Sequence, residues 1–375
     1  MAIKAEKEGE ILERRESFLS SNAELVAIDR ELEELLKKQL AKVKVFGVGG
    51  GGGNTISRMK EIGIKGCEMI AVNTDAQDLL YSDADYKILI GKEITQGLGA
   101  GSNPRVGEEA AHESDSEIKK KLSNTDMIFI TCGLGGGTGT GAAPVIAELA
   151  KKQGALVVGV ITLPFTMEGK KRIENSIYGL ERLESSVDTL IVIPNDKLLE
   201  LAPELPLQTA FKVADEILTN AVKGITELVT KSGLVNLDFA DVKAVMMNGG
   251  VSLIGMGESD SQHRALEAVE KAIANPLLDV DISNATGALI NIVGGPDLTL
   301  DEAKIIVSTI GEKLSPDAKM IWGAQISEDL DHSIRVMLIV TGVKSSQIIG
   351  VSSGVTPEIK KQTEMKQELG IEFLE

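Results

Sequence analysis

The sequence predicts an α/β protein with a doubly wound parallel sheet, a long central helix and a smaller α/β domain after that helix. Short apolar, β-branched runs alternate with amphipathic helical stretches between Lys42 and Pro194. This alternation is typical of a parallel sheet with helices on both faces. A long periodic apolar stretch follows over 207–231, and a second set of strand-like and helical stretches begins after Gly233. A chain of 375 residues is long enough for two packed domains.

Five parts are expected along the chain. The first is charge-rich, but leucines and Ile28 recur at helical spacing after Ser21, which begins a capping-box sequence. The long stretch after Leu207 carries one apolar face and is followed by Ser232 and Gly233, a helix stop signal. The expected parts are a helical N-terminal extension (1–41), a nucleotide-binding domain (42–206), a central helix (207–233), a C-terminal domain (234–343) and a polar tail (344–375).

Within these domains, individual strands and helices follow from the pattern of apolar residues. In the first domain we expect strands at 43–48, 69–73, 87–90, 127–131, 156–163 and 189–194, with helices at 55–62 and 142–152 among others. In the second domain we expect strands near 251–257, 288–293, 320–326 and 334–341, and helices near 264–274 and 300–314. Ligands of such a parallel sheet bind at the carboxyl ends of its strands.

Composition excludes several classes of function. The net charge of -17 disfavours a nonspecific role on nucleic acid or on a bare anionic membrane. Only two cysteines occur, both in apolar stretches, which indicates inert core thiols in a reducing compartment. The three histidines are far apart, so a protein-ligated zinc or iron site is not expected. No apolar run is long enough to span a bilayer, and the acidic N-terminus is unlike a targeting peptide. A cytoplasmic protein is expected.

The first glycine run, 47–53, follows an expected strand and opens an expected helix. Glycines let backbone N–H groups approach an anion, and a helix N-terminus adds a favourable dipole. The run contains the pattern G-x-G-x-x-G, and Asp75 lies near the place of a ribose carboxylate in dinucleotide-binding units. At this point a nicotinamide-dependent oxidoreductase remains a competing interpretation. A P-loop does not, because no Gly-Lys-Ser/Thr follows.

The second glycine run, 133–141, favours a nucleoside triphosphate. Dinucleotide binding needs only one glycine turn, yet a second strand, a second glycine run and a second helix follow the first. Each glycine costs conformational entropy and contributes no side chain to packing, so a purely structural role explains the run poorly. Successive N–H groups and the hydroxyls of Thr138 and Thr140 suit a chain of phosphates.

The run Gly135–Gly141 resembles the signature of the tubulin/FtsZ superfamily, and the surrounding chain is similar to its FtsZ branch. Supporting motifs stand in the family's order at 73–77, 97–101, 164–172, 194–198 and 236–241. The resemblance implies binding of GTP and GDP with Mg2+, GTP hydrolysis, and head-to-tail homopolymer filaments. It also implies a role in the cell-division ring at midcell.

The resemblance also implies nucleotide-contacting residues throughout the first domain and the central helix. Residues 50–54 of the first glycine run would hold the α- and β-phosphates, and the loop 99–101 would contact the γ-phosphate. Glu168 and Arg172 would contact the ribose. An exposed ion pair between these two side chains is the alternative. Asn195, Phe211 and Asp215 would contact the base, where Asp215 accepts two N–H bonds that guanine offers and adenine does not. The full set is Gly50, Gly51, Gly52, Gly53, Asn54, Asn73, Asp75, Gly99, Ala100, Gly101, Gly135, Gly136, Gly137, Thr138, Gly139, Thr140, Gly141, Glu168, Arg172, Asn195, Phe211 and Asp215.

Hydrolysis is expected to need two subunits. Asp238 and Asp241 follow the central helix, while the glycine loops belong at its other end. A helix of that length is roughly 37 Å long, so these carboxylates cannot reach the γ-phosphate of their own chain. In a head-to-tail filament they would polarise the attacking water on the neighbour's GTP, with Asn236 assisting. The alternative is an acidic turn that caps the helix 239–246 through Asp238. Mg2+ would be held by phosphate oxygens and water, with no side-chain ligand assigned.

Other members of the superfamily remain alternatives: a filament for plasmid segregation or cell shape, and a structural relative that does not hydrolyse. The end of the chain, Ile371–Glu375, lacks the proline and terminal basic residue of the bacterial tail that docks membrane-adaptor proteins. Adaptors remain expected partners, but docking through this tail is not expected. The N-terminal extension and this ending resemble an archaeal-type relative.

Overall fold

The computed structural model describes residues 41–201, 207–230, 234–235, 237–278 and 282–343. The expected N-terminal helix, the stop signal at Ser232 and Gly233, Asn236 and the tail from 344 lie outside the described residues.

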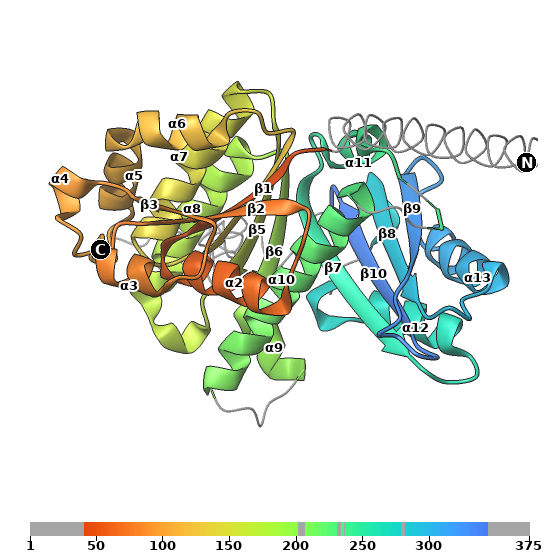
Figure 1. Cartoon of the computed structure of the whole chain (residues 1–375). Coiled ribbons are helices and arrows are strands. Elements are labelled where there is room, and N and C mark those ends of the chain that lie inside the picture. Colours follow the sequence, from red (N-terminus) through yellow and green to blue (C-terminus); the bar gives the residue numbers. More distant parts are fainter. Residues whose placement is uncertain (1–40, 202–206, 231–233, 236, 279–281, 344–375) are drawn as a thin grey trace, which may run out of the picture. The chain divides into compact units, whose positions relative to one another are not determined.

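Ten strands of the described residues form one sheet in the order β3-β2-β1-β4-β5-β6-β7-β10-β8-β9 (Figure 1). Pairing is parallel from β3 to β7, antiparallel on both sides of β10, and parallel between β8 and β9. The strands are β1 (Val43–Val48), β2 (Cys67–Asn73), β3 (Tyr86–Leu89), β4 (Met127–Gly133), β5 (Leu156–Leu163), β6 (Thr189–Pro194), β7 (Gly250–Ser259), β8 (Gly287–Gly294), β9 (Lys319–Ile326) and β10 (Ile334–Thr341).

Helices cover both faces of this sheet, as the alternation of apolar runs predicts. The helices are α2 (Gly49–Ile62), α3 (Ala76–Tyr81), α4 (Lys92–Thr95), α5 (Pro104–Glu113), α6 (Asp115–Leu122), α7 (Thr138–Lys152), α8 (Lys170–Ser186), α9 (Asn195–Leu201), α10 (Leu207–Thr230), α11 (Phe239–Met246), α12 (Arg264–Ile273) and α13 (Leu300–Gly311). Three 3-10 turns lie at η1 (Thr166–Glu168), η2 (Pro276–Leu278) and η3 (Ile282–Asn284).

Two apolar cores lie on opposite faces of the sheet because successive side chains of a strand alternate in direction. In β1, Phe46 and Val48 belong to the core beneath α5–α8, α12 and α13. Val43 and Val45 belong to the other core, with α2, α10 and α11. Strand β1 is therefore apolar on both sides.

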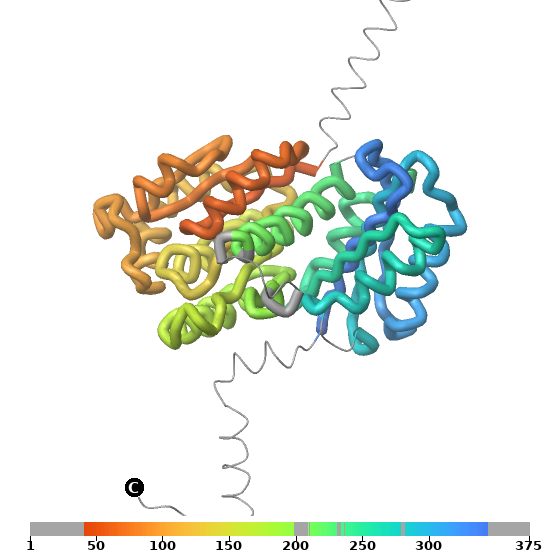
Figure 2. The backbone as a smooth tube through the Cα atoms, turned by 90° about the horizontal axis from the view of Figure 1, so that it is seen from below, coloured from red at the N-terminus to blue at the C-terminus, as the bar shows by residue number. Residues whose placement is uncertain are grey.

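Helix α10 confirms the periodic stretch after Leu207. Ala214, Leu218, Ala221 and Ile225 are buried against the sheet at helical spacing. Figure 2 shows this green helix running between the orange and yellow helices of the N-terminal part and the blue C-terminal strands. It therefore contacts elements of both halves of the chain.

The sheet does not stop between the two halves. Strand β6 pairs with β7 at three positions, Thr189 with Gly250, Leu190 with Val251 and Ile191 with Ser252. This junction links the parallel part to the mixed part, whereas the sequence pattern predicts two separate sets of strands. Pairing between strands so far apart in sequence leaves no local signal in either of them.

Candidate nucleotide site

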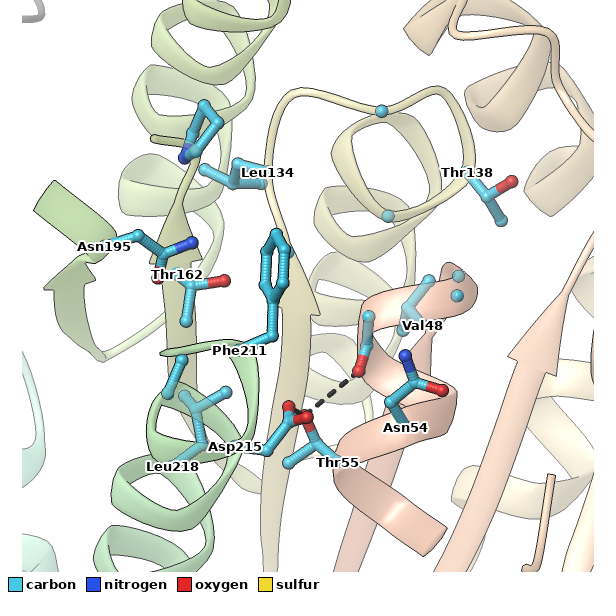
Figure 3. A pocket seen from close by; sticks show the side chains of 18 of the residues that line it. Val48, Asn54, Thr55, Leu134, Thr138, Thr162, Asn195, Phe211, Asp215 and Leu218 are labelled. Atoms are coloured by element: carbon cyan, nitrogen blue, oxygen red, sulfur yellow. Dashed lines mark hydrogen bonds between the residues drawn. The ribbon is translucent and has the colours of Figure 1, made fainter. Parts of the chain in front are cut away.

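A cavity of about 480 Å³ lies at the carboxyl ends of β1, β4, β5 and β6. Its volume is within the range of small-ligand pockets in proteins. Its walls come from the two glycine loops, the loop after β5 and the first turns of α10 (Figure 3). The lining residues are Val48, Gly49, Gly50, Gly51, Asn54, Thr55, Gly133, Leu134, Gly136, Gly137, Thr138, Gly139, Thr162, Pro164, Glu168, Arg172, Asn195, Phe211, Ala214, Asp215 and Leu218.

Two helix N-termini meet at this cavity. Helix α2 begins directly after Val48, and α7 begins directly after Gly137. Neither N-cap residue makes a side-chain capping bond, and neither helix has an acidic residue in its first turn. The first N–H groups of a helix lack partners inside it and carry the positive end of its dipole. This end of the cavity is therefore suited to an anion such as a phosphate chain.

The glycine loops divide into residues that face the cavity and residues that pack against the protein. Gly50, Gly51, Asn54, Gly136, Gly137, Thr138 and Gly139 line the cavity as expected. Gly52, Gly53, Gly135, Thr140 and Gly141 are not among the lining residues.

Close packing explains these latter positions. A Cβ on Gly52 would lie 2.6 Å from the Thr131 carbonyl oxygen, and one on Gly141 would lie 1.9 Å from the Pro104 carbonyl oxygen. The Thr140 hydroxyl is buried and accepts a hydrogen bond from the Gly135 N–H at 3.0 Å. These glycines therefore permit the backbone of one element to approach another, and Thr140 supports the turn.

The predicted γ-phosphate loop is held by the residues before it. Asn73 is buried, and its Oδ1 accepts from the N–H groups of Thr74 and Asp75. Asp75 caps α3 by accepting from the N–H groups of Gln77 and Asp78. Both side chains are thus engaged in local structure and lie outside the cavity lining.

One expectation for this loop changes. The Gly99 N–H, assigned to phosphate above, donates to the Thr74 carbonyl oxygen at 3.2 Å. Ala100 and Gly101 follow it, and none of the three lines the cavity. Asn103 then caps α5 by accepting from the Arg105 N–H, with Pro104 in the first turn of the helix.

The opposite end of the cavity carries an aromatic ring and a carboxylate. Phe211 and Asp215 both line it from successive turns of α10, as their spacing predicts (Figure 3). The Phe211 ring is 41% exposed and packs edge-on against Phe165, with ring centroids 5.2 Å apart. Asn195 is buried, and its Oδ1 has no hydrogen-bond partner among the described residues. A buried acceptor without a partner beside a cavity indicates a place for a ligand donor.

Asp215 is the perturbed acid of this cavity. Burial raises the pKa of its carboxyl to about 6, against the lowering effects of a hydrogen bond from Thr55 and the charge of Arg58. The Thr55 hydroxyl donates to Asp215 Oδ1 at 2.9 Å. Thr55 belongs to α2 and was not among the expected site residues, because no local pattern in the sequence links it to a residue on another helix.

Glu168 and Arg172 form an ion pair at the cavity wall. Arg172 donates to Glu168 Oε2 at 2.6 Å, and the other carboxylate oxygen accepts from the Phe165 N–H. Both residues line the cavity. The two expectations for this pair are therefore compatible, since an ion pair at this wall can also face a ligand.

Asp238 and Asp241 are exposed and lie beyond the far end of α10. Asp238 caps α11 by accepting from the Ala240 N–H at 3.3 Å. Asp241 is in the first turn of the same helix. Neither lines the cavity.

Three further observations concern the described residues as a whole. They contain no group of three or more His, Cys, Asp or Glu side chains placed to hold a metal ion. No helix among them is long and apolar enough to cross a membrane. Cys132 is buried and Cys67 half-buried, and burial raises the pKa of these thiols to about 12 and about 11.

Comparison with known families and proteins identifies relatives over most of the chain. Residues 42–203 match the "Tubulin/FtsZ family, GTPase domain", and residues 250–344 match the "FtsZ family, C-terminal domain". The chain is 64% identical over 318 residues to cell division protein FtsZ 1 of Thermococcus kodakarensis, covering 85% of each chain. It is 60% identical over 322 residues to cell division protein FtsZ 1 of Methanocaldococcus jannaschii, covering 86% of this chain and 88% of the relative.

Solved structures show the same relationship. The structure titled "FtsZ dimer, empty (M. jannaschii)" superposes with a TM-score of 0.81 at 60% identity, covering 84% of this chain and 92% of that one. The CetZ2 protofilament from Haloferax volcanii has a TM-score of 0.73 at 22% identity, covering 86% of this chain and 99% of that one, and shares the fold. The glycine loops, the cavity and these matches together establish that the chain belongs to the tubulin/FtsZ family of GTPases, within its FtsZ branch of cell-division proteins.

Proposed function

We propose that GTP binds in the cavity with its phosphates across the N-termini of α2 and α7 and its base against Phe211 and Asp215. The main support for this proposal is that the two ends of the cavity differ in chemistry. One end has two helix N-termini without side-chain caps, and the other has a carboxylate and an aromatic ring. An anion would accept hydrogen bonds from the helix N-termini at the first end, and a ligand donor would pair with the carboxylate at the second.

Guanine suits the second end because its N1–H and N2–H point the same way. An ionised Asp215 offers two acceptor oxygens at matching spacing, while adenine offers no such pair of donors. Asn195 Oδ1 is a further buried acceptor at this end. In this proposal Glu168 and Arg172 contact the ribose, and Mg2+ is held by phosphate oxygens and water.

The loop at 99–101 does not line the cavity, and its proposed role is to contact the γ-phosphate of bound GTP. Its γ-phosphate contacts come from Ala100 and Gly101, since the Gly99 N–H is engaged by Thr74. The buried Asn73 and the half-buried Asp75, together with Gly135 and Thr140, serve this site by holding its loops.

Hydrolysis is proposed to occur between subunits stacked head to tail. The helix from Asp215 to Thr230 alone is about 22 Å long, so Asp238 and Asp241 lie far from their own cavity. Both are exposed, as residues that complete a neighbour's site must be. Solved relatives bearing the titles of a dimer and a protofilament support self-association. In this proposal the two carboxylates, assisted by Asn236, orient the attacking water on the GTP of the adjacent subunit.

Complementation between two variants tests this arrangement. Asp238→Ala retains the cavity but lacks the acid, and Asp215→Ala retains the acid but binds GTP poorly. Each variant alone is expected to hydrolyse GTP slowly, and a mixture is expected to regain activity, because Asp238 of one subunit reaches GTP in the other. The assay is phosphate release at constant total protein. A mixture no faster than the average of its components contradicts a shared site.

A second measurement tests assembly dependence. Turnover per subunit is expected to rise only above a threshold protein concentration, because the site forms at an interface. A rate per subunit that is independent of concentration contradicts the proposal.

We propose that these filaments form the division ring at midcell, in the cytoplasm, with membrane-adaptor proteins as further partners. The similarity to cell division proteins over most of the chain supports this role. A fluorescent fusion is expected to form a midcell band before constriction. A protein spread along the cell in dividing cells contradicts this assignment.

A further inference from the structure

Helix α2 contributes a side chain to the base end of the cavity as well as its N-terminus to the phosphate end. Thr55 is 1% exposed and lines the cavity one turn after Gly51. Its hydroxyl is 2.9 Å from Asp215 Oδ1 and 3.0 Å from the Gly51 carbonyl oxygen. Figure 3 shows Thr55 and Asp215 facing each other across the gap between α2 and α10.

We infer that Thr55 is a positioning residue for guanine recognition, whose hydroxyl orients the Asp215 carboxylate toward the base. This inference rests on the assignment of Asp215 to guanine proposed above. Thr55 touches neither the base nor the phosphates in this inference and acts through Asp215 alone.

The hydroxyl has one hydrogen and two acceptors, and the charge of Asp215 decides between them. An ionised carboxylate is the stronger acceptor, so the hydrogen turns toward Asp215. When the carboxyl is protonated, its O–H donates to Thr55 Oγ1, and the hydroxyl hydrogen turns toward the Gly51 carbonyl oxygen. Either state leaves every polar hydrogen of this buried group paired, which fixes the carboxyl at one place in both.

Only the ionised state accepts both N–H bonds of guanine. Burial raises the pKa of Asp215 to about 6, and the Thr55 hydrogen bond lowers it by favouring the charged form. The positive charge of Arg58 on α2 acts in the same direction. Other charged groups act around this site: Glu61 of α2 pairs with Arg58, the charge of Glu216 on α10 also acts on Arg58, and the Glu168–Arg172 pair lines the cavity.

GDP affinity as a function of pH reads out this effect. Affinity is expected to fall as the pH drops below the pKa of Asp215 in the free protein. The pH at which the plot of log affinity against pH changes slope, here called the break, marks that pKa. Loss of one hydrogen bond to a charged group corresponds to a shift of about one to two pH units. A residue with a purely structural role would lower affinity equally at all pH values and leave the break in place.

The matched variants are Thr55→Ala and Thr55→Ser, which both lack the methyl group and differ only in the hydroxyl. Thr55→Ser is expected to keep the wild-type break. Thr55→Ala is expected to move it upward by about one unit or more, with about tenfold weaker GDP binding at pH 6 and nearly normal binding at pH 9. Thr55→Val, which keeps the shape of threonine, is expected to behave as Thr55→Ala does.

The probe is GDP, titrated calorimetrically into the full chain from pH 5 to 9. Asp215→Asn serves as the reference, because any break that remains in it comes from the phosphates of GDP. If Asp215→Asn keeps the wild-type affinity and break, the assignment of Asp215 to guanine fails. If Asp215→Asn loses the break but Thr55→Ala and Thr55→Ser both keep it, the role of Thr55 is overturned and the assignment of Asp215 stands.

Discussion

Two glycines of the same glycine run, 133–141, are predicted to respond in opposite ways to the same substitution. Gly136 lines the cavity, and a Cβ placed on it meets no atom within 4 Å. Gly141 lies five residues later in α7, where a Cβ would be 1.9 Å from the Pro104 carbonyl oxygen and 2.7 Å from the Glu108 backbone nitrogen of α5. We therefore expect Gly141→Ala to disturb stability and Gly136→Ala to disturb binding.

The contact distances set the magnitudes. An ordinary carbon–oxygen contact is about 3.3 Å, so Gly141→Ala requires α5 and α7 to separate by more than an ångström. Overpacking of this kind costs about 3 kcal/mol, offset by about 1 kcal/mol of helix propensity gained from alanine. The net loss of about 2 kcal/mol lowers the melting temperature by roughly 3 °C. Gly136→Ala leaves the melting temperature within about 1 °C, but its methyl group enters the phosphate end and weakens GDP binding about tenfold or more.

The assay is thermal unfolding of the nucleotide-free proteins together with GDP titration of each. A wild-type melting temperature in Gly141→Ala would show that α5 and α7 can separate without loss of stability. Wild-type GDP affinity in Gly136→Ala would remove this position from the phosphate site.

Two further predictions concern buried polar contacts. The Asn175 side-chain amide donates to the carbonyl oxygens of Ser102 and Gly135 at 2.9 and 3.1 Å. Asn175→Asp loses both hydrogen bonds, because a carboxylate has no hydrogen to donate. This variant is expected to lower the free energy of unfolding by about 2 kcal/mol and to weaken nucleotide binding. Urea unfolding and GTP titration measure these effects, and a variant as stable as wild type contradicts the bridging role. Arg264 donates to Glu302 and holds the pKa of that carboxyl below its ordinary value of 4.5. The pair therefore stabilises the fold above about pH 4.5. This stabilisation is lost as the pH falls through the lowered pKa of Glu302. Arg264→Met is expected to cost about 2 kcal/mol at pH 6 and progressively less as the pH falls through that lowered pKa, and a difference in urea unfolding that stays the same throughout acid titration contradicts the assignment.

The order of the elements was predictable because it depends on short-range patterns. Alternating apolar runs identified the strands of the parallel part, and helical spacing identified α10 with Phe211 and Asp215 on one face. The caps of α5 and α11, at Asn103 and Asp238, were predictable because a cap is a contact within three residues.

The sequence by itself therefore determined the fold class, the family and the two glycine loops that line the cavity. The tertiary structure decided which glycines face the cavity and which, such as Gly52 and Gly141, allow two backbones to approach. It also decided that β6 and β7 join the two halves in one sheet, and that Thr55 contacts a carboxylate 160 residues away. The physical reason is that spacing along one helix or strand is fixed by its own geometry. Contacts between elements depend instead on how those elements pack, and no run of neighbouring residues records that packing.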